Sequence, residues 1–173
     1  MYKVESVRDI SINMLDNFDR RQVVTQRYDL TDNIKSIQPI SFVDDWSENT
    51  KHEIVKKFFM SEDYYNSGVY DKGKLVAFTS LYLYPIGPEQ EYLEMKMLHV
   101  DKAFRGKGLG KLLFADAAQK AKALKAKKLY ISAHSAVETQ EFYMALGCVD
   151  TTWISPKAFE EEPYDIHMEY RLV

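Results

Sequence analysis

The chain has 173 residues, of which 46% are apolar and 28% charged, and its formal net charge is −3. These values exclude a compositionally disordered chain and a general binder of polyanions. The one cysteine, Cys148, excludes an internal disulfide and is typical of a reducing compartment. Because the N-terminus lacks an apolar signal-peptide core and no apolar run reaches about 18 residues, we expect a soluble cytoplasmic protein without a membrane segment.

The first third of the chain predicts two helices and a hairpin. Apolar residues recur at helical spacing over 9–18, with Asp9 as the predicted N-cap, so we expect a helix there. The strand-like runs 22–28 and 34–40 flank turn residues and predict a β-hairpin. Residues 47–63 are amphipathic and predict the second helix.

The middle of the chain predicts most of a sheet. The segments 67–71 and 74–84 flank a short glycine turn and form the clearest hairpin pattern of the sequence. A further strand is predicted over 91–100, a helix over 109–125 and another strand over 127–134. Because a helical crossover joins the last two strands, we expect them to run parallel.

The C-terminal part predicts a short helix and two closing strands. Ser135 and Glu138 have the spacing of a capping box at the start of that helix, and Gly147 is placed to end it. Strand-like runs follow at 148–154 and 164–172. The whole order of elements predicts an α/β fold with one mixed sheet, antiparallel at first and then containing a parallel pair.

The most informative stretch of the sequence is FRGKGLGKLL, which lies between a predicted strand and a predicted helix. Its three glycines, Gly106, Gly108 and Gly110, would let an anion reach the free N–H groups of the helix N-terminus. The spacing excludes a Walker A loop, because Lys111 is followed by Leu112 instead of a Ser or Thr. It also excludes the Gly-x-Gly-x-x-Gly dinucleotide pattern, so neither nucleotide fold is predicted.

Positive charge is concentrated around and after these glycines. Residues 101–128 contain nine Lys or Arg and two Asp, in a chain whose total charge is negative. The lysines from 120 onward are typical of a solvated helix face, whereas the basic residues of 102–111 indicate an anion site. Binding of a nucleic acid through 102–128 remains an alternative, which the overall acidity disfavours.

The stretch from Arg105 to Gly110 resembles the Arg/Gln-x-x-Gly-x-Gly/Ala signature of the GCN5-related N-acetyltransferases, the GNAT family. The following segment, LYISAHSAVETQEFYMALGCV, is similar to that family's next strand and its helix with a Phe-Tyr-x-x-x-Gly element. The resemblance is specific over 74–149. It implies one acetyltransferase domain over 1–173, with 1–45 as a variable N-terminal elaboration. It also implies a mixed central sheet with a splayed parallel strand pair and flanking helices.

The resemblance implies acetyl-CoA as co-substrate, with its pyrophosphate on the loop amides and its pantetheine arm on the splayed strand. One strand N–H group would then stabilise the oxyanion that forms on the thioester carbonyl. Three positions depart from the family pattern, namely Lys102, Ala136 and Cys148, and only Ala136 removes an expected pantetheine contact. The residues assigned to acetyl-CoA in this way are Leu98, His99, Val100, Arg105, Gly106, Lys107, Gly108, Leu109, Gly110 and Lys111.

Amide formation from a thioester needs a neutral amine and a proton for the departing thiolate. Tyr143, at the family's tyrosine position, is the predicted proton donor. Glu94 is the predicted base, because a carboxylate in a half-buried strand suggests that it faces a cleft; His99, His134 and a water relay remain alternatives. Cys148 is not predicted to be a nucleophile, and the four histidines lack metal-ligand spacing, so no metal is expected.

The acceptor is the least defined part of the prediction. The acidic run 159–165 is either a solvated loop or, with Asp44, Asp45 or Glu48, part of a groove for a cationic amine. We therefore predict transfer of acetyl to a primary amine of a small molecule or a peptide, by direct attack in a ternary complex. A non-catalytic acyl-CoA-binding module is the main alternative. No nucleic acid or membrane partner is expected, and a homodimer is left open.

Overall fold

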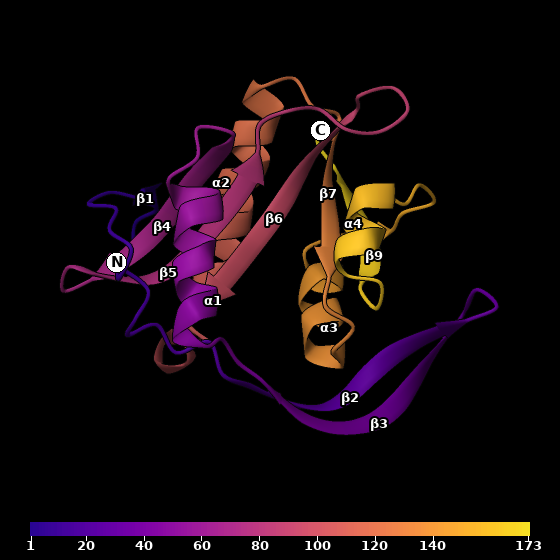
Figure 1. The fold of residues 1–173 in the computed structure, drawn as a ribbon. Coiled ribbons are helices and arrows are strands. Elements are labelled where there is room, and N and C mark those ends of the chain that lie inside the picture. Colours follow the sequence, from indigo (N-terminus) through magenta and orange to yellow (C-terminus); the bar gives the residue numbers. More distant parts are fainter.

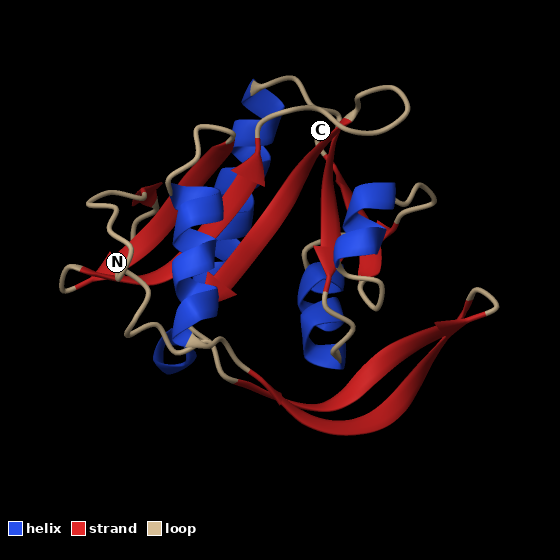
Figure 2. Cartoon of the chain, viewed as in Figure 1, coloured by secondary structure: helices blue, strands red, loops and turns tan.

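The computed structural model describes residues 1–173 and is built around a seven-stranded mixed sheet with helices on both faces (Figures 1 and 2). One parallel pair stands among antiparallel neighbours, as predicted. In spatial order the strands are β1 (Glu5–Ser6), β4 (Tyr64–Asp71), β5 (Lys74–Tyr82), β6 (Tyr92–Val100), β7 (Lys128–Ala133), β9 (Ile166–Arg171) and β8 (Val149–Asp150).

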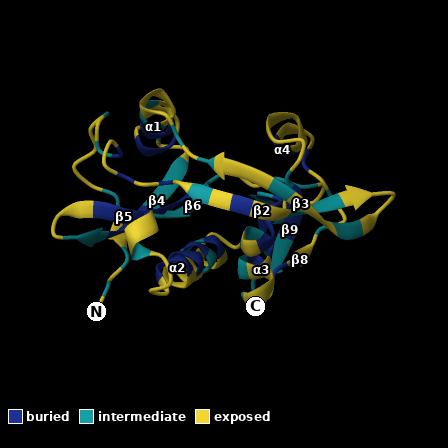
Figure 3. Cartoon of the chain, turned by 90° about the horizontal axis from the view of Figure 1, so that it is seen from below, coloured by how far each residue is buried: buried dark blue, intermediate teal, exposed yellow.

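Two helices cover each face of the sheet (Figure 3). On one face lie α1 (Glu48–Ile54), which continues into a π-helical turn over Val55–Phe59, and α4 (Pro156–Glu161). On the other face lie α2 (Leu109–Ala123) and α3 (Val137–Ala145). None of these helices combines the length and the apolarity needed to cross a lipid bilayer.

The parallel strands β6 and β7 pair over only part of their length. Their register runs from Tyr92 opposite Lys128 to Glu94 opposite Tyr130 and then stops. Beyond that point β6 stays paired with β5, while β7 stays paired with β9. A register shift in the β5–β6 pairing, between Ser80 and Leu81, lies near the place where the strands part, and such bulges bend and twist a strand. The predicted splayed parallel pair is therefore present.

A separate β-hairpin lies outside the main sheet. Its strands are β2 (Gln22–Thr31) and β3 (Ile34–Asp44), joined by Asp32 and Asn33 with φ of 51° and 61°. Two consecutive positive φ angles match the twist of a tight hairpin turn. The hairpin crosses below the ends of β6 and β7, between the two helix layers (Figures 1 and 3). The predicted hairpin is confirmed and is longer than the sequence indicated.

The core is divided by the sheet into two main clusters. On the α2 and α3 side, Phe114 and Ala117 pack with Leu129 of β7. On the α1 side, Phe58 and Phe59 pack with Phe78 of β5. The helical periodicity that predicted α1 and α2 therefore reports burial against opposite faces of one sheet.

The predicted helix over 9–18 is wrong. Residues 12–17 form successive turns, and Asp9 has a φ of 53°, which is not an N-cap conformation. Leu15 and Phe18 are buried beside α1, whereas Ile10 is exposed. The apolar residues are satisfied by packing against α1, so their spacing does not require a helix.

One prediction in the C-terminal part is also wrong, and one helix was missed. The predicted capping box does not form, because the N-cap residue of α3 is Ala136, which has no capping side chain, and the Ser135 hydroxyl forms no hydrogen bond to the N–H of Glu138. The missed helix is α4, which includes the first residues of the acidic run 159–165. Ser155 caps α4, its hydroxyl accepting from the N–H of Ala158 at 3.3 Å, and Pro156 follows it. A Ser-Pro pair of this kind was a readable helix start.

Candidate active site

A cavity of about 1040 Å³ opens where β6 and β7 diverge. It extends from the N-terminus of α2, past the splayed strands, to α4 and Asp165, the residue before β9. Its lining includes Tyr143, Glu94 and nine of the ten residues assigned to acetyl-CoA from the sequence. The exception is Lys107, whose ammonium lies over the ring of Phe104 at 4.6 Å.

The three glycines of the loop have two different structural roles. Gly106 and Gly108 adopt φ of 74° and 79°, a left-handed conformation that other residues rarely adopt, and a Cβ at either position would enter open space. Gly110 is helical, and a Cβ there would stand 3.0 Å from the ring of Phe142 on α3. The first two glycines shape an open loop, and the third permits close packing of α2 against α3.

The loop presents a row of free N–H groups to the cavity. None of the backbone N–H groups from residue 106 to 111 donates to an acceptor within the chain. Gly108 is the N-cap of α2 and provides no side-chain acceptor. Lys111, in the first turn of α2, lines the same space. Free amides, a helix N-terminus and a nearby ammonium together form a site for an anion such as a pyrophosphate.

The guanidinium of Arg105 is bonded to the protein itself. Its Nε donates to the carbonyl of Val100 at 3.2 Å, and its two terminal nitrogens donate to the carbonyls of Arg21 at 2.8 Å and Arg20 at 2.9 Å. The side chain therefore holds the loop against the segment that leads into β2.

The exposed edge of β6 follows from strand alternation. The N–H of Asp101 donates to the carbonyl of Val76 on β5 at 2.9 Å. Because backbone groups alternate in direction along a strand, those of Val100 and Leu98 point the opposite way, into the opening between β6 and β7. His99 has the other parity, and its backbone groups face β5. Of the three strand residues assigned to the pantetheine arm, Leu98 and Val100 thus present backbone groups to the cavity.

The two histidines near the opening are held in neutral form. The ring of His99 lies edge-on to Trp46 at 4.6 Å, and its pKa is lowered well below the usual value by burial and by the nearby Arg20 and Arg105. His134 accepts from the N–H of Ala136 at 3.0 Å through Nδ1, and burial lowers its pKa. His134 thereby satisfies a free N–H group at the start of α3.

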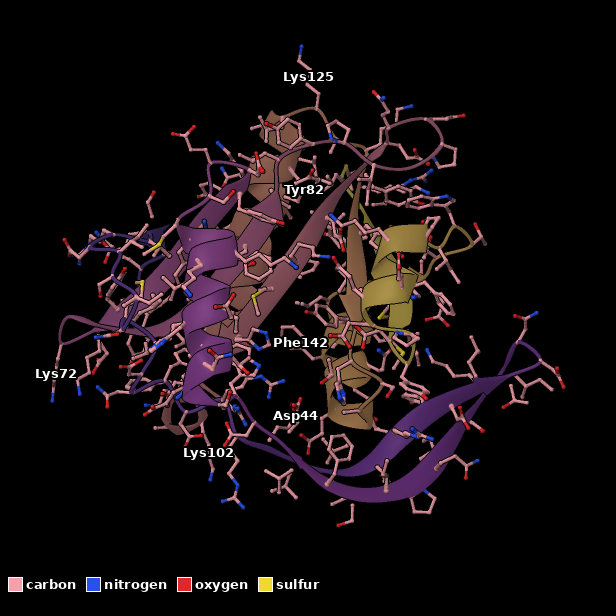
Figure 4. The ribbon with its side chains drawn as sticks, viewed as in Figure 1. Asp44, Lys72, Tyr82, Lys102, Lys125 and Phe142 are labelled. Atoms are coloured by element: carbon pink, nitrogen blue, oxygen red, sulfur yellow. The ribbon has the colours of Figure 1, made fainter.

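Tyr143 occupies the buried face of α3 beside the opening. Its ring contacts Phe142 edge-to-face at 5.1 Å, and its hydroxyl forms no hydrogen bond within the chain. Burial is the main cause that raises the pKa of Tyr143 above its usual value. The phenol therefore keeps its proton at physiological pH, as a proton donor requires. Figure 4 shows the neighbouring Phe142 on α3, toward β6, and Asp44 at the end of β3 below it.

Glu94 is the last residue of β6 that pairs with β7, and its side chain is buried, with 8% exposed. The ammonium of Lys96 lies 3.1 Å from Glu94 Oε1 and 2.7 Å from Glu161 Oε2 on α4. Burial raises the pKa of Glu94, and the adjacent ammonium of Lys96 opposes this shift. Lys96 was not singled out from the sequence, because its two partners come together only in the folded chain.

Asp165 is a second buried carboxylate in the cavity. Its Oδ2 accepts from the hydroxyl of Ser132 on β7 at 2.9 Å, and burial raises its pKa to about 6. The sequence marked the acidic run that ends at this residue but did not distinguish Asp165 within it. Its position directly before a predicted strand was the available signal.

The comparison with known proteins agrees with this geometry. A sequence model of the acetyltransferase (GNAT) family matches residues 31–148, more than half of the chain. The chain belongs to this family. The match confirms the predicted family and supports the prediction of an acyltransferase that uses acetyl-CoA. It also begins well before the segment in which the sequence motifs were specific.

An uncharacterized N-acetyltransferase of Halalkalibacterium halodurans is 32% identical over 103 residues, and the match spans 56% of this chain and 57% of that relative. The crystal structure of a nourseothricin acetyltransferase has a TM-score of 0.73 at 15% identity, with 99% of each chain covered. A putative streptothricin acetyltransferase from Bacillus anthracis, in complex with acetyl coenzyme A, has a TM-score of 0.72 at 17% identity, covering 100% of this chain and 99% of that one. These two structures share the GNAT fold with this protein.

The end of this cavity beside α4 is rich in acid groups. Three cationic side chains, Arg20, Lys57 and Lys96, lie among the carboxylates there. Asp45 and Glu48, which were considered from the sequence, do not line the cavity. The carboxylates that line this end are Asp44, Glu94, Glu161, Glu162 and Asp165.

Proposed function

We propose that this protein transfers the acetyl group of acetyl-CoA to a cationic primary amine, by direct attack of the amine on the thioester in a ternary complex. The observation that carries this proposal is one continuous cavity with two chemically different ends. One end offers free amides for a pyrophosphate, and the other offers buried carboxylates for an ammonium group. A donor and an acceptor bound at these ends would meet at the opening between β6 and β7.

The donor end would hold acetyl-CoA mainly through backbone groups. In this proposal the amides of 106–111 bind the pyrophosphate, Lys111 adds a positive charge, and Lys107 reaches the phosphates from the surface. The backbone groups of Leu98 and the N–H of Val100 bind the pantetheine arm, since the carbonyl of Val100 accepts from Arg105. One of their N–H groups then donates to the thioester oxygen and stabilises the oxyanion of the tetrahedral intermediate.

Tyr143 is the proposed general acid. The amine nitrogen attacks the thioester carbon, and the carbon–sulfur bond breaks as the intermediate collapses. The departing sulfur takes the phenolic proton of Tyr143 and leaves as the CoA thiol, and the phenolate regains a proton from solvent. For an acceptor that arrives as an ammonium ion, the products are the amide, the CoA thiol and one proton released in addition.

Glu94 is the proposed base, acting directly or through a water molecule. Its raised pKa makes it a better proton acceptor than an exposed glutamate, and the ammonium of Lys96 favours its ionised form. Asp165, with a pKa of about 6, is the second candidate for this role. Glu94→Gln and Asp165→Asn distinguish the two, because only loss of the true base removes the acid limb of the kcat/KM profile.

The acidic end of the cavity supports a cationic acceptor. Five carboxylates line it, and two of them, Glu162 and Asp165, have no cationic partner within 4.0 Å. Two structural neighbours are named for acetyl transfer to nourseothricin and streptothricin, and we propose a small amine of that kind as the first class to test here.

A thiol-release assay with acetyl-CoA tests the proposal against nourseothricin, polyamines, aminoglycosides, amino acids and short peptides. We expect turnover with at least one multiply charged amine and at least 100-fold lower kcat for Tyr143→Phe. No turnover with any amine, despite tight binding of acetyl-CoA, would instead support a non-catalytic acyl-CoA-binding module. Equal kcat/KM for charged and uncharged amines would contradict the proposed role of the carboxylates.

A further inference from the structure

The loop that carries the glycines is bonded to a segment more than 80 residues away. The N–H of Asp19 donates to Asp101 Oδ2 at 2.8 Å, and the carbonyl of Asp19 accepts from the N–H of Lys102 at 2.9 Å. The carbonyls of Arg20 and Arg21 accept from Arg105. Four hydrogen bonds thus join 101–105 to 19–21. We call this set the loop clamp.

A second set of contacts continues from the clamped segment to the acceptor end of the cavity. The side chain of Arg20 is buried, and its Nη2 donates to Asp44 Oδ2 at 2.8 Å. Its guanidinium also lies over the ring of Trp46 at 5.4 Å. Asp44 and Trp46 both line the cavity. The same arginine therefore bonds to the acetyl-CoA loop through its backbone and to the acceptor wall through its side chain.

The clamped segment also fixes both ends of the β2–β3 hairpin. Residue 22 begins β2 directly after the segment, and Asp44 ends β3 against Arg20. Farther along, the N–H of Tyr28 donates to the carbonyl of Ser135 at 2.8 Å, at the start of α3. The hairpin thus crosses the opening between the α1–α4 layer and the α2–α3 layer (Figures 1 and 3).

The chemistry of Arg105 suits a clamp. A guanidinium has five N–H donors in a rigid fork, and three nitrogens of this one are bonded to three carbonyls. Burial and the neighbouring Arg20 lower the pKa of Arg105. The guanidinium groups of Arg105 and Arg20 thus lie near each other despite the repulsion between their positive charges. A lysine would keep the charge but could not donate to all three carbonyls in their present positions.

We propose that Arg105 is a positioning residue for the amine acceptor. Through the loop clamp and Arg20 it holds Asp44 and the hairpin that form one wall of the acceptor end. Its part in binding the phosphates of acetyl-CoA is minor by comparison. The proposal rests on the proposed function, because it assigns the acceptor to the end of the cavity beside Asp44.

Arg105→Lys tests this proposal in the full chain, with three readouts. We expect the Kd of acetyl-CoA, measured by calorimetry, to change less than about 3-fold, and the KM of the acceptor to rise about 10-fold. Hydrogen exchange of the backbone amides in 19–44 should become faster. A fall of 10-fold or more in acetyl-CoA affinity with unchanged exchange would overturn the proposal and make Arg105 a phosphate ligand.

Asp101→Asn is the second variant, because it weakens the clamp without removing a positive charge. Its amide retains only one acceptor oxygen for the two N–H groups of Asp19 and Ala103 that the carboxylate now serves. We expect faster exchange in 19–44 and a higher acceptor KM, as for Arg105→Lys. Unchanged exchange and unchanged KM in this variant would also overturn the proposal.

Lys102→Ala is the matched control. It removes one positive charge from the same loop but leaves the backbone N–H that donates to Asp19. Exchange in 19–44 and the acceptor KM should stay at their wild-type values, and a change as large as that of Arg105→Lys would contradict the clamp. Exchange and the acetyl-CoA Kd need no turnover. They therefore test the clamp even if the amine panel refutes the proposed function.

Discussion

The two ends of the cavity are built in different ways. The donor end comes largely from one continuous segment, residues 98–111, and presents mostly backbone groups. The proposed acceptor end is built from side chains of β3, β6, α4 and the segment just before β9, which lie far apart in the sequence. Backbone recognition depends on local conformation, whereas the acceptor end depends on the tertiary arrangement. The difference separates what a short motif can encode from what only the fold can assemble.

This division predicts which binding and kinetic constants each variant changes, and measuring those constants can contradict it. Changes to the backbone of the glycine loop should alter the constants for acetyl-CoA. Changes at the acceptor end, or at Arg105 through the loop clamp, should alter those for the amine. Tyr143 lies in the same cavity as both and should alter neither binding step.

Tyr143→Phe should have the largest effect on kcat. We expect a fall of about 100- to 1000-fold, because general acid catalysis typically contributes that much, with the Kd of acetyl-CoA and the acceptor KM each within about 3-fold. The hydroxyl forms no hydrogen bond within the chain, so thermal stability should not change. Tyr164→Phe, at a tyrosine that is 80% exposed, is the control. An unchanged kcat for Tyr143→Phe would remove Tyr143 from the chemistry.

Gly108→Ala should act on the donor end alone. We expect acetyl-CoA affinity to fall about 30- to 100-fold, because the new Cβ would enter the space proposed for the pyrophosphate, with the acceptor KM unchanged at saturating acetyl-CoA. Gly73→Ala is a closely matched control. Gly73 has the same φ of 79°, also has no atom within 4 Å of a built Cβ, and lies in the turn between β4 and β5.

Both glycine variants should lose about 1–2 kcal/mol of folding stability, the cost of a left-handed conformation for an L-residue. Calorimetry for acetyl-CoA and thermal unfolding separate the two effects. Equal acetyl-CoA affinity in the two variants would show that the loop conformation at 108 has no special relation to the donor.

Asp165→Asn should act on the acceptor end and on the pH dependence of stability. The folded-state pKa of about 6 lies above the usual value, so the native state binds this proton more tightly than the unfolded chain does. The stabilisation is present below about pH 4 and is lost as the pH rises through about 6. The asparagine variant should therefore have a higher Tm than the wild type at pH 8, by about 2–4 °C, and lose this advantage at pH 4.

The same variant should raise the KM of a cationic acceptor about 5- to 10-fold at pH 8, while the Kd of acetyl-CoA stays constant. Thermal scans at the two pH values and steady-state kinetics measure these outcomes. A change in acetyl-CoA affinity as large as the change in acceptor KM would break the division between the two ends.

The accuracy of the sequence analysis followed the same division. The glycine loop, the crossover between the parallel strands and the two hairpins were predicted because glycine, turn residues and strand runs act over a few positions. The helix over 9–18 was wrong because its apolar spacing is satisfied by turns whose Leu15 and Phe18 pack beside α1. The start of α4 was readable from the Ser155-Pro156 pair, but the helix has only six residues, too few for a helical periodicity to indicate it.

The site residues show why the rest could not be read from the sequence. Lys96 has its role only because β6 brings it within reach of Glu161, which is 65 positions later. Arg105 matched a phosphate-binding motif, yet its donors bond to carbonyls 84 and 85 positions earlier in the chain. A motif gives the position of a side chain in the chain, but its partners are set by how the sheet and hairpin pack.

Ser155→Ala should have the smallest effect and tests the acceptor end from a distance. Loss of the hydroxyl that accepts from the N–H of Ala158 should destabilise the protein by about 1 kcal/mol. Because α4 carries Glu161, which bonds to Lys96, we expect the acceptor KM to rise about 2- to 3-fold. The Kd of acetyl-CoA and kcat should not change, because α4 lies on the opposite face of the sheet from α2.

Ser155→Thr retains the hydroxyl and should behave as the wild type in both thermal unfolding and steady-state kinetics. If Ser155→Ala instead raised the constants for acetyl-CoA and for the amine equally, α4 would serve both ends of the cavity. The two ends would then be one mechanical unit, and a local motif at the donor end would be sensitive to a helix cap on the far face of the sheet.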